Sequence, residues 1–161
     1  MKIQIVNAND KIIGAKDIRK IDYENDIYRV SALWITNSKG KILLARRAFS
    51  KKLNPGKWGP AVAGTIEDGE TYESNIIKES EEELGLKNIK PKKGRKELSK
   101  GKYKHFTQWF ILKSDFKLKD LKVSEKEVAE VKWFSKQKVI RVIETNSDEV
   151  LKNMKKWINL F

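Results

Sequence analysis

The feature that most constrains this sequence is a run of acids inside a basic chain. The segment GTIEDGETYESNIIKESEEELGL (64–86) places four glutamates among the five residues from Glu79 to Glu83. The whole chain, by contrast, carries 35 Lys and Arg against 22 Asp and Glu, a net charge of +13. Thr71 can cap the start of a helix and Gly85 can end it, so the residues between them are predicted to be helical. The fold must place this helix where its acids are tolerated.

The acids of this helix gather on one side. At 100° per residue, Glu79, Glu82 and Glu83 share an arc of about 100°. Acids near the carboxyl end of a helix oppose its dipole, and like charges three or four residues apart repel by a few tenths of a kcal/mol per pair. A hard cation such as Mg²⁺ or Mn²⁺ would remove this conflict because it prefers oxygen ligands, whereas the alternative is a solvated acidic face. The adjoining side carries the residues predicted to be buried, namely Ile76, Ile77, Ser80 and Leu84.

The spacing of the segment resembles the 23-residue box of the Nudix (MutT-like) hydrolases, written G-x5-E-x7-R-E-U-x-E-E-x-G-U, where U is aliphatic. Two positions depart from it, because Lys78 replaces the arginine and Ser80 replaces the first aliphatic residue. Lysine lacks the planar fork that grips a carboxylate at two points, so its orienting contact with Glu70 is expected to be looser. The matching positions are Gly64, Glu70, Glu79, Glu82, Glu83, Gly85 and Leu86.

The resemblance implies an α/β/α sandwich with a mixed β-sheet, of class α/β (α+β). It also implies a metal-dependent hydrolase that cleaves the diphosphate linkage between a nucleoside diphosphate and another moiety, with Mg²⁺ (or Mn²⁺) as cofactor. Glu82 would help to activate water, and Glu70 and Lys78 would orient the site. The implied metal ligands are Glu79, Glu82, Glu83 and the carbonyl oxygen of Gly64.

Further candidates lie outside the box. Family members often supply a late acid as ligand or base, for which Glu127 is the first candidate and Glu130 the second, although either can be an ordinary acid at a strand edge. Arg46 and Arg47 are candidates for phosphate binding, with a surface ion pair as the alternative. Trp58 can stack on a base, or it can belong to the core.

Residues 3–90 resemble, less specifically, the Nudix branch related to isopentenyl-diphosphate isomerase. That resemblance raises isomerisation of an allylic diphosphate as a rival activity. The isomerase has a catalytic Cys and a metal-binding His on either side of the box glycine, where this chain has Ala63 and Thr65. Its other histidine ligands have no counterpart, because His105 is the only histidine. The isomerase activity is therefore disfavoured.

A second rival is a basic RNA-binding module. The segment from Lys87 to Lys104 carries nine basic residues and one acid, and aromatic residues Tyr103, Phe106 and Trp109 lie in or just beyond it. Basic residues interleaved with aromatic ones can hold single-stranded RNA. In a β-hairpin, however, alternation would bury the rings and leave the lysines in water.

Length and composition predict one cytoplasmic domain, residues 1–161, that does not associate with membranes. No apolar run approaches the roughly 18 residues of a membrane span, no signal peptide is recognisable, and the chain has no cysteine. A small nucleoside diphosphate derivative is the expected partner. The oligomeric state is open, with a homodimer as one option.

Hydrophobic patterns place the other elements. Two short strands are expected about the turn at Asn9 and Asp10, and a hairpin is expected from 28–36 and 41–47. The remaining predicted strands are 61–64, 103–112 and 128–134, and two helices are predicted after Ser135 and after Asn146 or Ser147.

Overall fold

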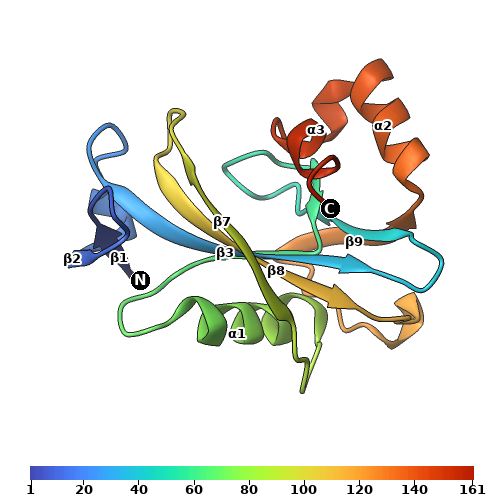
Figure 1. Ribbon diagram of the computed structural model, residues 1–161, viewed down its shortest axis with the longest axis horizontal. Coiled ribbons are helices and arrows are strands. Elements are labelled where there is room, and N and C mark those ends of the chain that lie inside the picture. Colours follow the sequence, from blue (N-terminus) through green and yellow to red (C-terminus); the bar gives the residue numbers. More distant parts are fainter.

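The computed structural model describes all residues, 1–161, as a nine-stranded mixed sheet with helices on both faces (Figure 1). None of the helices is long and apolar enough to cross a bilayer. The strands are β1 (Lys2–Val6), β2 (Ile12–Asp17), β3 (Ile27–Thr36), β4 (Ile42–Arg47), β5 (Trp58–Pro60), β6 (Val62–Thr65), β7 (Lys92–Ser99), β8 (His105–Lys113) and β9 (Val128–Phe134). The helices are α1 (Tyr72–Leu84), α2 (Lys136–Thr145) and α3 (Met154–Trp157), with 3-10 turns η1 (Ile18–Lys20), η2 (Leu118–Asp120) and η3 (Ser147–Glu149).

Strand β3 is the centre of the sheet, because it pairs with β1, β4, β6 and, in parallel, β8. Its side chains alternate between two apolar cores. Leu33 and Ile35 belong to the core between the sheet and α1. Ala32 and Trp34 belong to the core between the sheet and helices α2 and α3. Because both faces of β3 are covered, the predicted α/β/α sandwich with a mixed sheet is confirmed.

The predicted hairpin of β3 and β4 forms but soon opens. Only Ile35 and Thr36 of β3 pair with β4, at Leu43 and Ile42. Beyond that point β6 pairs with β3 and β5 pairs with β4, so both short strands lie between the diverging arms. The sequence predicted only β6 of these two. The opening brings the glycine of β6, Gly64, next to α1.

Helix α1 begins and ends where its caps predict. The Thr71 side chain accepts a hydrogen bond from the backbone of Ser74, whose side chain accepts one from the Thr71 backbone, and Gly85 ends the helix at φ 68°. Ile76, Ser80 and Leu84 are fully buried as predicted. The prediction for Ile77 was wrong, since its side chain is 37% exposed.

The second predicted C-terminal helix is interrupted. After η3, Val150 adopts an extended conformation and forms a bridge with Trp58 of β5. The Leu151 amide also donates to the Trp58 carbonyl at 2.9 Å. This backbone pairing to the sheet prevents a continuous helix, and only α3 follows, although Met154 and Ile158 are buried as predicted.

Candidate active site

The acids of α1 line a cavity of about 460 Å³ that we call the glutamate cavity. Its walls come from the carboxyl end of α1, from β6, from β4 and from the segment just before β9. Figure 1 shows α1 on one face of the sheet, and the cavity lies on that side of the sheet. The charged residues that line it are Arg47, Lys51, Glu67, Glu79, Glu82, Glu83 and Glu127.

Two of these glutamates are held in an environment that disfavours their charge. Burial, and secondarily repulsion from Glu82, Glu70 and Glu127, raises the pKa of Glu79 to about 7, although Lys78 opposes the rise. Burial likewise raises the pKa of Glu83 to about 8, with repulsion from neighbouring carboxylates adding to it. Clustered acids with raised pKa values are the arrangement that a bound cation would stabilise.

Gly64 packs directly against Glu79. A Cβ atom at residue 64 would lie 2.3 to 2.7 Å from side-chain atoms of Glu79, so a larger residue there would force the Glu79 side chain to shift. Asn75, which is fully buried, donates to Glu70 at 2.8 Å and lies 3.4 Å from Glu79. The Asn75 amide oxygen accepts from Ser31 at 2.5 Å, which ties α1 to β3. The box glycine and glutamate are therefore positioned by packing.

Lys78, which stands at the arginine position of the box, contacts Glu70 directly. Its Nζ atom lies 2.6 Å from Glu70 Oε1 and 2.7 Å from Glu67 Oε1. Desolvation would lower the pKa of Lys78, but these two carboxylates outweigh it and raise the pKa. Lys78 therefore contacts Glu70 at one carboxylate oxygen and shares its ammonium with Glu67.

Two cations lie in the same cavity as the acids. Arg47, a predicted phosphate-binding candidate, lines it and is anchored by a 3.0 Å hydrogen bond from Nε to the Leu53 carbonyl. Lys51, which the sequence did not single out, pairs with Glu127 at 2.5 Å. Only the loop after β4 brings Lys51 to this point, so no periodic pattern could have identified it.

Three predicted candidates lie elsewhere. Arg46, Trp58 and Glu130 line a smaller cavity of about 230 Å³ on the opposite face of the sheet. Successive residues of a strand point to opposite faces, so Arg46 and Arg47 cannot share one cavity. Trp58 is 7% exposed and packs edge-on to Phe134, with ring centroids 4.9 Å apart. Of the two late acids, only Glu127 reaches the glutamate cavity.

The donors around the cavity fit Mg²⁺ or Mn²⁺, because they are carboxylates with the Gly64 backbone on one wall. In their present positions no three of the acids lie close enough together to share an ion, so binding requires side chains such as exposed Glu82 to rotate inward. Ala63 and Thr65 flank Gly64 on β6, and His105 does not line the cavity. The isomerase residues are therefore missing from the site.

The sequence is similar to known proteins along most of its length. The profile of the NUDIX domain matches residues 27–158. An uncharacterized Nudix hydrolase of Listeria monocytogenes is 27% identical over 84% of this chain and 80% of that protein. The chain spans about half the length of other curated Nudix hydrolases that it matches, such as 48% of one from Yersinia pestis. An isopentenyl-diphosphate Delta-isomerase of Citrobacter koseri is 43% identical, but over only 33% of this chain and 29% of the isomerase.

Solved structures share the fold. DR0079 from Deinococcus radiodurans superposes with a TM-score of 0.83 at 20% identity, over 99% of this chain and 98% of that one. The NUDIX domain of Shewanella oneidensis NrtR, crystallised with ADP ribose, superposes with a TM-score of 0.66 at 14% identity, over 89% and 90% of the two chains. These superpositions show that the three proteins share one fold.

Proposed function

Because this chain belongs to the Nudix family, we propose that it is a metal-dependent hydrolase that cleaves the diphosphate linkage of a nucleoside diphosphate derivative. The observation that carries the proposal is the gathering of five glutamates and two cations around one cavity of about 460 Å³. The ADP ribose bound to the Shewanella domain supports a nucleoside diphosphate derivative as the substrate class.

Each charged residue has a role in this proposal. Glu79, Glu82, Glu83 and the Gly64 carbonyl would hold Mg²⁺ or Mn²⁺, which when bound supplies charge stabilisation to phosphoryl oxygens and lowers the pKa of water. Glu82 or Glu127 would accept the proton of the attacking water. Arg47 and Lys51 would contact the phosphates, because they are the cations that line the cavity. Lys78 would hold Glu70 and Glu67 in place.

The general test is a product-release screen with and without Mg²⁺. The panel contains nucleoside diphosphate sugars, ADP-ribose, NADH, dinucleoside polyphosphates and oxidised nucleoside triphosphates. Hydrolysis of at least one substrate that requires the cation is the expected outcome. Conversion of isopentenyl diphosphate to its dimethylallyl isomer would instead establish the isomerase activity.

Glu82→Gln removes a ligand and a proton acceptor without changing the size of an exposed side chain. We expect turnover to fall at least about 10²-fold, while the thermal unfolding midpoint stays close to that of the wild type. Steady-state kinetics on the best substrate measures the first quantity and a thermal melt the second. An unchanged rate would remove Glu82 from the mechanism.

Glu127 and Glu130 provide a matched pair of late acids, since only the first lines the glutamate cavity. Glu127→Gln should lower kcat by about 10-fold or more. Glu130→Gln makes the same chemical change on the opposite face and should leave kcat within about twofold of the wild type. The reverse order of effects would transfer the role to Glu130.

A further inference from the structure

Four aromatic rings gather outside both apolar cores, beside the turn that joins β7 and β8. Tyr23 and Tyr103 meet edge-on with centroids 4.9 Å apart, and Tyr28 stacks on His105 at 5.2 Å. Tyr23 is 36% exposed, and the other three are partly buried. None of the four belongs to either core cluster. Tyr28 and His105 are neighbours across β3 and β8, and the rings of Tyr23 and Tyr103 extend this pair beyond the two cores.

Lysines alternate with the aromatic residues at this turn. Lys100 and Lys102 are exposed, and the Lys102 ammonium lies 5.6 Å from the centroid of the Tyr103 ring. Lys104 donates to the Glu24 carbonyl, which ties the segment bearing Tyr23 to the turn. None of the three lysines forms an ion pair with a carboxylate. The rings thus lie beside positive charge that the protein leaves uncompensated.

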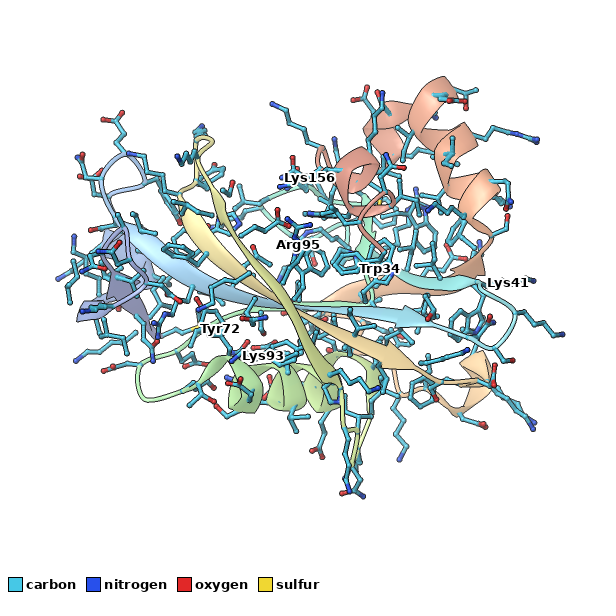
Figure 2. All side chains as sticks on the ribbon, viewed as in Figure 1. Trp34, Lys41, Tyr72, Lys93, Arg95 and Lys156 are labelled. Carbon is cyan, nitrogen blue, oxygen red and sulfur yellow. The ribbon has the colours of Figure 1, made fainter.

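The middle of β7 is different from the turn, because its lysines form ion pairs with carboxylates. Lys93 pairs with Glu73 of α1 at 2.6 Å, and Lys96 pairs with Asp10. Figure 2 shows Lys93 on the side of α1 and Arg95 and Lys156 on the other side of the strand. The exposed edge of β7 carries further basic residues, of which Lys90 and Lys92 lie at the end remote from the turn. Its basic residues without an ion pair are Lys90, Lys92 and Arg95.

We propose that this aromatic–lysine surface, made of Tyr23, Tyr28, Tyr103, His105, Lys100, Lys102 and Lys104, binds single-stranded nucleic acid. Base stacking on aromatic side chains contributes about 1–3 kcal/mol per base, and lysines contact the backbone phosphates. A duplex cannot stack in this way because its bases are already paired and stacked. Of the neighbouring acids, Asp26 is paired with Lys16, so the field of the lysines is weakened only by Asp22 and Glu24, which form no ion pair.

The residues differ from those expected from the sequence. Phe106 and Trp109 are 9% and 1% exposed, so they are unavailable for stacking, whereas Tyr23 and Tyr28 come from a distant segment. No residue of the surface lines the glutamate cavity. The proposed binding is therefore independent of the proposed hydrolysis, and either can fail without the other.

Fluorescence anisotropy with labelled 12-nucleotide RNA and DNA single strands and the matching duplexes tests the proposal. We expect the full-length protein to bind single strands more tightly than duplexes at low salt. Comparison of the affinities for RNA and DNA single strands shows which of the two is preferred. The triple substitution Lys100→Gln, Lys102→Gln and Lys104→Gln should weaken binding at least about 10-fold. It should also reduce the slope of log affinity against log salt by about 2, at about 0.7 per lost phosphate contact.

Matched controls separate a specific surface from general basicity. Lys117→Gln, Lys119→Gln and Lys122→Gln remove the same charge from exposed positions beyond the far end of β8, and should leave the affinity within about twofold. Tyr103→Leu should weaken binding about 5-fold or more without changing the salt slope, whereas Tyr103→Phe keeps the ring and the affinity. Glu82→Gln should bind as the wild type does.

Three outcomes would overturn the proposal. The first is no binding at low salt, and the second is equal affinity for single strands and duplexes. The third is equal weakening by the two triple substitutions, which would mean that net charge alone attracts the nucleic acid. Thermal melts of each variant confirm that folding is retained, and the Tyr103→Phe protein keeps the test informative if Tyr103→Leu unfolds.

Discussion

At the scale of single residues, the box works through close packing as much as through charge. The Glu79 side chain occupies the space where a Cβ atom on residue 64 would lie. Lys78, which replaces the usual arginine, still reaches Glu70 by sharing its ammonium with Glu67. The departure from the family pattern therefore leaves the orientation of Glu70 supported by a two-carboxylate contact.

We expect Gly64→Ala to lower stability by about 1–3 kcal/mol, because the added methyl group collides with Glu79. Turnover should also fall at least about 10-fold, since Glu79 must move from its position. Gly14→Ala is the matched control, because a Cβ there meets nothing within 4 Å. Denaturant unfolding and steady-state kinetics of both variants measure the effects, and similar results for the two would contradict the packing argument.

At the scale of elements, α1 is defined by its two ends. Thr71 and Ser74 exchange hydrogen bonds at the start, and Gly85 takes the left-handed conformation at the end, where its amide donates to Glu81 at 2.9 Å. The acids occupy the last turns, and the cap lies about two to three turns away from them. Stability and site geometry are therefore separable on this helix.

Thr71→Ala should destabilise the protein by about 1 kcal/mol, because one backbone N–H at the start of α1 loses its acceptor. The melting midpoint should fall by about 2–4 °C. Thr71→Ser retains a hydroxyl and should stay near the wild type. Turnover at 25 °C should change by less than about twofold in both variants, and a large loss of turnover in Thr71→Ala would mean that the cap controls the site.

At the scale of the whole molecule, the raised pKa values of Glu79 and Glu83 couple stability to pH. The usual value for a glutamate is 4.5, whereas these two carboxyls titrate at about 7 and about 8 in the folded protein. Between about pH 4.5 and pH 8 the folded protein therefore holds more protons on these two carboxyls than the unfolded protein does. The stability contributed by the protonated carboxyls is thus fully present below about pH 4.5 and is lost as pH rises toward 8.

We therefore expect the melting temperature of the metal-free protein to decrease as the pH is raised from 5 to 8. Mg²⁺ or Mn²⁺ should restore it at pH 8 by binding the ionised carboxylates. His105, whose pKa burial lowers from 6.5, acts in the opposite direction at the acidic end of this range. Glu83→Gln shares that histidine effect, so the difference between the two proteins isolates Glu83. The variant should show a flatter pH profile, and parallel profiles would contradict the assignment.

The box, the caps of α1 and most of the longer strands could be predicted from the amino-acid sequence, because they depend on spacing and on local backbone preferences. The sequence could not show that Lys51 lies beside Glu127 or that the last helix is interrupted. Alternation along β4 separates Arg46 from Arg47, but it does not tell which of the two faces the acids. Those features depend on how the β3–β4 hairpin opens and on pairing between Trp58 and Val150, which are remote in the chain. Contacts between distant segments leave no periodic trace in a sequence, so only the tertiary structure decided them.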